Sequence, residues 1–265
     1  MSRAKSVMMS IAASVATAGV CVAQAQQAPA VDPKAIVAGV YQQDKSRDAT
    51  FHVTLNVFDA SNQETHKKFV LERIGSPGAG RTLVRFTEPP DIKGLELLSI
   101  DEPGTETKQY LYVPAIDRAR PLSAREQSER FADSDFTYED IGERVLDDFT
   151  YTLVSDTDVM DKHKTYKIEL QPISPDKSQY KYIYVWIAQD IPVILHAQMF
   201  DAEGQMVREL AASDIKHESG VWGARRLEMT TSAAHTKTDL IFDSVKFDSG
   251  LRESLFTPDA LGKTK

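Results

Sequence analysis

The feature that most constrains this chain is a series of segments in which apolar and polar residues alternate with a period of two. Phe51, Val53 and Leu55 share one side of such a segment, and polar side chains occupy the other side. This period is typical of a half-buried β-strand. Similar segments occur at residues 69–71, 84–86, 149–153, 166–170, 193–199 and 240–242. The pattern predicts a mainly β protein.

Turn-forming residues separate these segments, among them Pro103-Gly104 and Ser219-Gly220. Their spacing is typical of hairpins and predicts eleven or twelve strands in one antiparallel sheet, which at this size usually curls or closes. Helix starts are expected at Asp32-Pro33 and Thr257-Pro258. Residues 121–140, here called the central segment, interrupt the hairpin rhythm with a charged stretch. We expect the central segment to be partly helical and to form a lid or binding element.

The first 25 residues have the pattern of a cleavable signal peptide. Arg3 and Lys5 precede an apolar run that ends near Val22, and Ala23-Gln24-Ala25 supplies the small residues that a signal peptidase requires. We therefore predict export with cleavage near Ala25, the alternative being a retained membrane anchor. The predicted organisation is a signal peptide at 1–25, an N-terminal tail and helix at 26–44, and one β domain at 45–265.

Cysteine content and charge exclude several classes of function for the exported chain. The only cysteine, Cys21, lies in the predicted signal peptide, so disulfides and cysteine nucleophiles are not expected. The formal net charge is −8, and removal of Arg3 and Lys5 makes it −10. An acidic protein of this kind is not expected to bind nucleic acid.

Motifs of known catalytic or cofactor sites are missing from the sequence. It contains no nucleophile elbow, phosphate loop or dinucleotide-binding glycine pattern, and no two histidines stand four residues apart. Residues 133–140 resemble a calcium loop, but Tyr138 stands where glycine is needed and Arg144 where a bidentate carboxylate is needed. We expect the acids of this loop to cap helices or fix the loop. The sequence thus predicts no metal site, no cofactor and no enzyme.

Large apolar side chains are numerous enough to form either a solid core or the wall of a cavity. In the second case they would line a hollow between the curved sheet and a helical lid, where an apolar ligand could bind. The candidate lining residues are Phe51, Val53, Leu55, Phe69, Leu71, Phe86, Tyr110, Tyr112, Phe149, Tyr182, Tyr184, Trp186, Trp222 and Phe242. The sequence alone does not decide between these two interpretations.

Arg73 departs from the apolar pattern of its segment. It has the same parity as Phe69 and Leu71, so a regular strand would direct its guanidinium toward the apolar side. A buried arginine needs carbonyl or carboxylate partners, which we expect on the central segment. The alternative is that the strand frays or bulges near Ile74 and Arg73 reaches water.

Several runs of the sequence resemble the outer membrane lipoprotein-sorting protein family, which has a LolA/LolB-like fold. They are Phe86-Thr87-Glu88-Pro89-Pro90-Asp91-Ile92-Lys93-Gly94, Tyr110-Leu111-Tyr112-Val113-Pro114-Ala115 and Phe131-Ala132-Asp133-Ser134-Asp135-Phe136-Thr137-Tyr138-Glu139-Asp140. The resemblance extends over residues 45–261. It implies a half-open antiparallel β-barrel, for which we expect about 11 strands, with short helices that form a lid.

The resemblance also implies a function. It predicts a soluble periplasmic carrier that binds the acyl chains of lipoproteins or lipids in a hydrophobic cavity and sorts them to the outer membrane. Arg73 would hold the lid closed in such a carrier, a role we call the lid latch. An inner-membrane exporter or transporter would be the partner, and the carrier itself would be a monomer. The alternative is a periplasmic lipid sensor or accessory module that regulates a membrane exporter or signalling protein.

Overall fold

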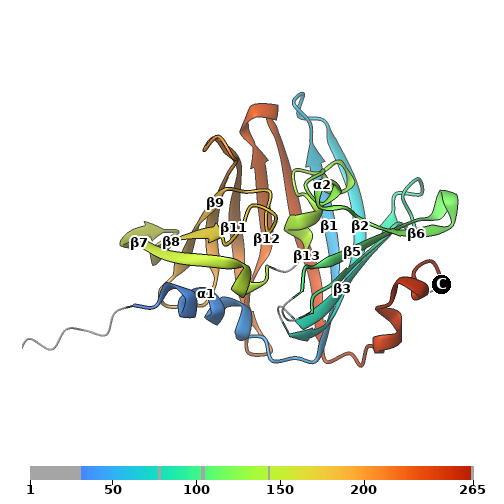
Figure 1. The fold of residues 1–265 in the computed structure, drawn as a ribbon, viewed down its shortest axis with the longest axis horizontal. Coiled ribbons are helices and arrows are strands. Elements are labelled where there is room, and N and C mark those ends of the chain that lie inside the picture. The colour runs from blue at the N-terminus through green and yellow to red at the C-terminus, as the bar shows by residue number, and fades with distance from the viewer. Residues whose placement is uncertain (1–30, 77–78, 103–104, 143, 264–265) are drawn as a thin grey trace, which may run out of the picture. The chain divides into compact units, whose positions relative to one another are not determined.

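The computed structural model describes residues 31–76, 79–102, 105–142 and 144–263. Strands dominate it, and its helices are short (Figure 1). The α-helices are α1 (Pro33–Gln42), α2 (Ala124–Gln127) and α3 (Tyr138–Ile141). The described residues also contain six 3₁₀ turns: η1 (Pro114–Ile116), η2 (Phe131–Asp133), η3 (Leu146–Asp148), η4 (Ser232–Ala234), η5 (Glu253–Leu255) and η6 (Pro258–Ala260). None of these helices is long and apolar enough to span a bilayer.

Thirteen strands of the described chain form one antiparallel sheet in the order β6-β5-β4-β3-β2-β1-β13-β12-β11-β10-β9-β8-β7. They are β1 (Asp48–Phe58), β2 (Glu64–Ser76), β3 (Ala79–Glu88), β4 (Glu96–Ile100), β5 (Lys108–Val113), β6 (Arg118–Pro121), β7 (Phe149–Met160), β8 (His163–Pro172), β9 (Tyr182–Ala188), β10 (Ile194–Phe200), β11 (Met206–Glu218), β12 (Val221–Thr231) and β13 (Thr236–Phe247). The sheet is open, with β6 and β7 at its two edges.

The expected mainly β, antiparallel architecture is confirmed, but the strand count of about 11 is too low. Two short strands lack the alternation on which the count depended. All five residues of β4 are buried, and the four residues of β6 are mostly exposed and end in Pro121. A strand that is buried or exposed on both faces has no period of two.

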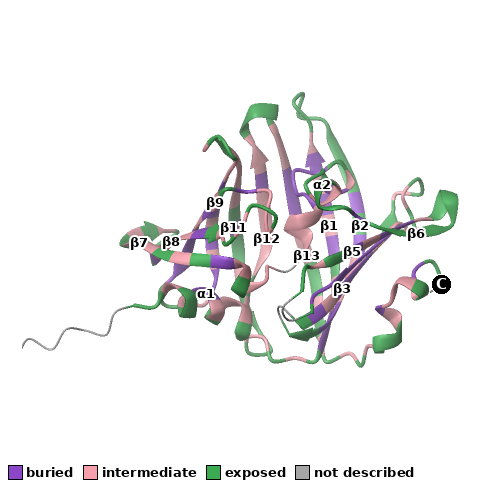
Figure 2. Cartoon of the chain, viewed as in Figure 1, coloured by how far each residue is buried: buried purple, intermediate pink, exposed green. Residues whose placement is uncertain are grey.

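The sheet has an inner face, which α1 and the central segment cover, and an outer face. Buried residues lie along the middle of the strands, while the hairpin ends are exposed (Figure 2). Phe131 of the central segment packs against Phe69 of β2 and Phe86 of β3, with ring centroids 6.0 and 5.4 Å apart. The central segment therefore fills this part of the inner face.

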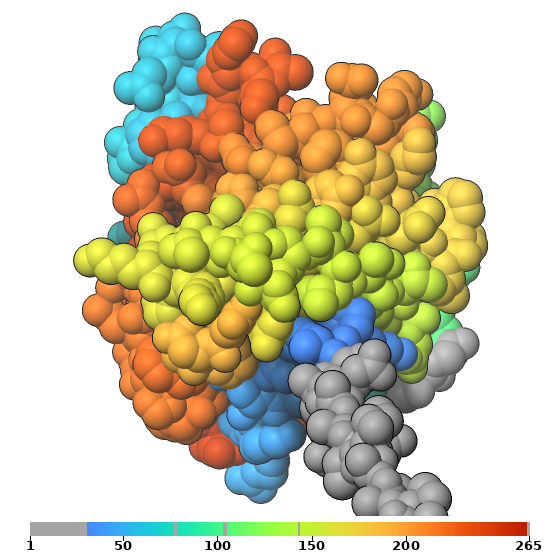
Figure 3. All heavy atoms as spheres, turned by 90° about the vertical axis from the view of Figure 1, so that its left-hand side faces the viewer, coloured from blue at the N-terminus to red at the C-terminus, as the bar shows by residue number. Residues whose placement is uncertain are grey.

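Helix α1 covers another part of the inner face. Asp32 caps its first turn by accepting a hydrogen bond from the Lys34 amide, and Pro33 occupies the first helical position, as the sequence predicts. Val37 is buried in the main core, and Lys34 Nζ lies 2.6 Å from Asp147 just before β7. Viewed from that side, α1 lies against the band of chain that leads into β7 (Figure 3). The compact unit Asp32–Lys265 includes both α1 and the sheet.

The outer face carries two smaller apolar clusters. Residues after β13 return across β3–β5, where Phe256 is fully buried and Leu261 is 5 % exposed. The Gly262 amide donates a hydrogen bond to Glu96 Oε2 at 2.8 Å, which holds the end of this segment. The second cluster forms around Val193 and Leu195 of the β9–β10 hairpin.

Candidate functional site

Strands β12 and β13 separate at one end of the sheet. Their pairing extends from Thr231 opposite Thr236 to Arg226 opposite Ile241 and ends there. Beyond this point, residues 221–224 of β12 pair only with β11, and β13 continues along β1 as far as Phe247 opposite Ala49. We call the gap between residues 221–225 and 242–247 the fork.

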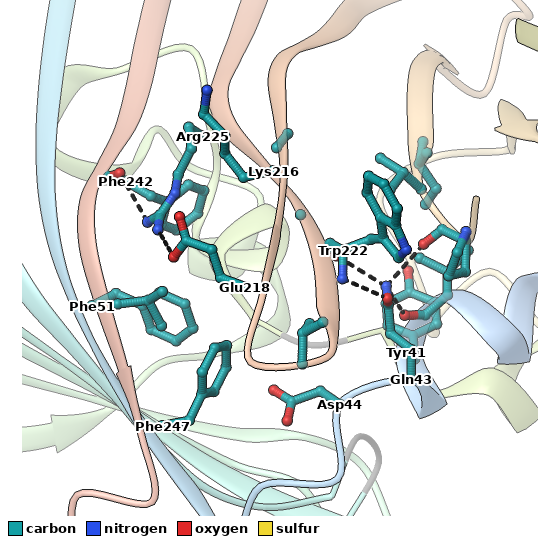
Figure 4. Close-up of a pocket in the computed structure, with 18 of the residues that line it drawn as sticks. Tyr41, Gln43, Asp44, Phe51, Lys216, Glu218, Trp222, Arg225, Phe242 and Phe247 are labelled. Carbon is teal, nitrogen blue, oxygen red and sulfur yellow. Dashed lines mark hydrogen bonds and ion pairs between the residues drawn. The ribbon is translucent and has the colours of Figure 1, made fainter.

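An apolar pocket with a volume of about 350 Å³ occupies the fork (Figure 4). Its walls come from α1, the segment that joins α1 to β1, the strands β1 and β2, the two strands of the fork, the end of β11, and the β9–β10 hairpin. The lining residues are Val40, Tyr41, Gln43, Asp44, Phe51, Arg73, Pro192, Val193, Ile194, Lys216, Glu218, Val221, Trp222, Gly223, Ala224, Arg225, Leu227, Phe242, Val245 and Phe247. The volume lies within the range of ligand-binding pockets in proteins.

Three phenylalanines form one wall of the pocket. The Phe51 ring lies 5.7 Å from Phe242 and 6.3 Å from Phe247, both edge to face. On the β12 side of the pocket, Gly223 contributes no side chain, and a Cβ at this position would meet no atom within 4 Å. The open space thus results from strand divergence together with the glycine on the β12 side.

Arg225 bridges the two sides of the fork. Its Nη1 donates to the carbonyl of Phe242 on β13 at 3.3 Å, and its Nη2 binds the Glu218 carboxylate. The Arg225 side chain is 18 % exposed and that of Glu218 is 44 % exposed. A half-buried guanidinium is therefore held at the mouth of an apolar pocket by a carbonyl and a more exposed carboxylate.

Arg73 is buried and fully engaged with the chain around it. Its Nη2 donates to Asp44 Oδ2 at 2.5 Å and to Ser46 Oγ at 2.8 Å, and its Nη1 donates to the Gly75 carbonyl at 2.8 Å. The side chain is 10 % exposed. Its partners thus lie on the segment between α1 and β1 and on β2 itself, not on the central segment where we expected them.

Gln43 joins the end of α1 to two hairpins. Its Nε2 donates to the carbonyls of Pro192 and Trp222 at 2.9 and 3.1 Å, and its Oε1 accepts from the Trp222 amide at 2.9 Å. Sequence reasoning missed this residue, because a glutamine after a helix has no local pattern that indicates partners 149 and 179 residues away. Its position makes α1 part of the pocket wall.

The structure brings together only part of the residues proposed as a cavity lining. Phe51, Trp222 and Phe242 line the pocket, and Arg73 joins them. Six others belong to the inner core or pack against it, where the central segment covers Phe69 and Phe86: Val53, Leu55, Phe69, Leu71, Phe86 and Phe149. Tyr110 and Tyr112 belong to the outer cluster beneath the C-terminal segment.

The remaining three candidates, Tyr182, Tyr184 and Trp186, lie on the outer face of β9. They alternate with Ile183, Val185 and Ile187, which belong to the inner core and so fix the direction of the strand.

These outer aromatic side chains form a row. Tyr182 stacks on Phe200 at 4.5 Å, and Trp186 Nε1 donates to Asp158 Oδ2 at 2.9 Å. Lys167 Nζ lies 4.5 Å from the Tyr184 ring centroid, a cation–π geometry.

Buried polar contacts fix the central segment to the sheet. Thr238 Oγ1 donates to Asp135 Oδ2 at 2.7 Å and accepts from the Asp135 amide at 2.9 Å; both side chains are buried. Tyr180 Oη donates to Asp140 Oδ2 at 3.0 Å. The pKa of Tyr180 is raised mainly by burial and, to a smaller extent, by the nearby Asp140 carboxylate. Asp140 also forms a capping box with Thr137, so these acids fix a loop and cap a helix as predicted.

In the described residues, no group of three or more His, Asp, Glu or Cys side chains could hold a metal ion.

Comparison with solved structures identifies the fold. A DUF1329 family protein from Desulfovibrio piger has a TM-score of 0.81 at 21% identity, and the match covers 87% of this chain and 100% of that one. A domain described as outer membrane lipoprotein-sorting, from Vibrio parahaemolyticus, has a TM-score of 0.81 at 22% identity, with 86% and 97% covered. A LolA superfamily protein from Nitrosomonas europaea has a TM-score of 0.72 at 17% identity, with 88% and 100% covered.

Sequence comparison adds a family assignment. No curated protein matches the chain. A family model whose description reads "Uncharacterized protein" matches residues 78–263, which is more than half of the sequence. The chain therefore belongs to the family that this model describes, and its fold is the LolA-like fold of the outer membrane lipoprotein-sorting domain.

Proposed function

We propose that this protein is a periplasmic carrier that shields the acyl chains of lipids or lipoproteins in the pocket of the fork during transfer toward the outer membrane. The observation that carries the proposal is the 350 Å³ apolar hollow, which Phe51, Phe242 and Phe247 border without filling. The lipoprotein-sorting name of the similar Vibrio domain supports the choice of ligand. The activity is binding and release, with no covalent step.

Hydrocarbon burial supplies the driving force for such a carrier. Each methylene that leaves water contributes about 0.8 kcal/mol, which is roughly a fourfold gain in affinity. A tail of ten methylenes would thus contribute about 8 kcal/mol before the cost of association is subtracted. Few directed hydrogen bonds are needed, which agrees with the absence of a catalytic motif in the sequence.

A chain-length series tests the proposal. Saturated fatty acids of 8 to 16 carbons should bind the purified protein with affinities that rise roughly fourfold per methylene until the pocket is full. Isothermal titration or displacement of a fluorescent acyl probe measures this slope. Native mass spectrometry of protein isolated from the periplasm should show a bound lipid. A flat series together with no co-purifying lipid would refute the carrier function.

Gly223 offers a variant that fills the pocket without disturbing the strand. Its backbone does not have a positive φ, and a Cβ there meets open space, so Gly223→Leu places a side chain in the hollow. We expect at least a tenfold loss of affinity for a 12-carbon acid. The matched control is Gly39→Leu on the exposed side of α1, where a Cβ also meets nothing within 4 Å and affinity should not change.

The periplasmic location is a separate part of the proposal. The predicted signal peptide, residues 1–25, lies outside the described residues. Expression of the full-length chain followed by fractionation should place it in the periplasm with Gln26 as the first residue. Retention in the membrane with an intact N-terminus would show that residues 1–25 anchor the protein.

A further inference from the structure

The charged residues that line the pocket of the fork are all engaged in ion pairs. The lining includes the cations Arg73, Lys216 and Arg225 and the acids Asp44 and Glu218, while the whole chain carries −8. Arg73 is neutralised inside the structure by Asp44, and Lys216 pairs with Asp214 at 2.7 Å. Arg225 is therefore the remaining cation, and its pairing with Glu218 decides what charge the mouth of the pocket presents.

The Arg225–Glu218 pair is asymmetric. Arg225 is the more buried partner and is anchored to the opposite strand through the Phe242 carbonyl. Glu218 is more than twice as exposed and stands at the end of the hairpin, next to the Ser219-Gly220 turn. A more buried guanidinium costs free energy without an anionic partner, whereas the exposed carboxylate is solvated by water. The position of the guanidinium is thus fixed, and the anion that neutralises it is exchangeable.

We infer that Arg225 binds the anionic head group of an amphiphile whose tail occupies the pocket, and that Glu218 holds this position when no ligand is bound. The inference rests on the proposed carrier function and specifies its ligand class as acyl chains with a carboxylate or phosphate close to the tail. Guanidinium matches both groups through paired N–H donors. In this arrangement the ligand carboxylate or phosphate replaces the Glu218 carboxylate, and the tail lies against Phe51 and Phe242.

The test compares ligands that share a tail and differ in charge. At pH 8, laurate should bind at least tenfold more tightly than methyl laurate. Arg225→Gln should reduce this preference to less than threefold while methyl laurate affinity stays within threefold of the parent. Arg47→Gln is the control for net charge, because Arg47 is 83 % exposed and does not line the pocket. It should keep the full preference.

Glu218→Gln provides the opposite perturbation and leaves Arg225 in place. Removal of the competing carboxylate should raise the affinity for laurate at least threefold and leave that for methyl laurate unchanged. This variant decides the matter even if Arg225→Gln fails to fold. Lauroyl lysophosphatidic acid distinguishes the two head groups, since a preference for it over laurate indicates a phosphate ligand and the reverse indicates a carboxylate.

The outcomes separate the inference from the function beneath it. Equal affinities for laurate and methyl laurate in the parent protein, or equal responses of both to Glu218→Gln, would overturn the head-group site and leave the carrier function intact. Absence of binding by either ligand would instead overturn the carrier function and the head-group site together.

Discussion

Replacement of Phe131 by alanine should show that the central segment is part of the core. Phe131 is 1 % exposed, and its ring lies 5.4 Å from Phe86, 5.6 Å from Tyr138 and 6.0 Å from Phe69. Deletion of a buried phenylalanine ring costs about 3–5 kcal/mol, through lost burial and the cavity that remains. Since a domain is stable by only about 5–15 kcal/mol, Phe131→Ala should lower the denaturation midpoint markedly.

Urea denaturation followed by tryptophan fluorescence measures this loss, with the slope of the transition unchanged. Ile116→Ala is the control, because Ile116 is 62 % exposed and its truncation should change stability by less than about 0.5 kcal/mol. A double-mutant cycle with Phe69→Ala should give a coupling energy of about 0.5–1.5 kcal/mol. A loss below about 1 kcal/mol for Phe131→Ala would mean that the central segment does not pack on the sheet.

Three further changes test other contacts of the fold. Thr238→Val keeps shape but leaves polar atoms of buried Asp135 without this partner, so the free energy of unfolding should fall by about 1–3 kcal/mol in a denaturant titration. Burial, despite the nearby Glu209 carboxylate, lowers the pKa of His196 below 6.5. The folded state therefore binds this proton less readily than the unfolded state. The free energy of unfolding of the protein should fall as the pH falls below 6.5, and His196→Asn should remove this pH dependence. Gly262→Ala should destabilise the C-terminal segment, because its φ is +76° and a Cβ would lie 2.3 Å from Tyr112, and proteolysis should then release this segment faster.

The sheet could be predicted because each strand carries its own signal. Alternation in β1 places Val53 and Leu55 on the inner face, and the observed register with β2 sets Val53 opposite Phe69. Such patterns are local, since one buried face is enough to produce them. The contact of Phe131 with Phe69 and Phe86 is not local, and no spacing in the sequence indicates it.

The pocket could not be predicted because it depends on where two strands separate. Pairing of β12 with β13 ends at Arg226, in the middle of β12, and no turn or break in the sequence accompanies this point. Gly223 is the one local sign, since a glycine within a strand often accompanies an open or closely approached backbone. The aromatic side chains of β9 illustrate the same limit, because Trp186 and Ile187 are both apolar and only the packing shows which faces inward.

The contacts of α1 and of the central segment also determine which of the two segments moves more readily. Displacement of the central segment would expose the buried pair of Asp135 and Thr238 and remove Phe131 from the core. Displacement of the end of α1 breaks the partly buried hydrogen bonds of Gln43, whose carbonyl partners water can satisfy. The second movement costs less, since it separates fewer buried apolar groups. The end of α1, which lines the pocket, is therefore the segment that moves at the lower free-energy cost.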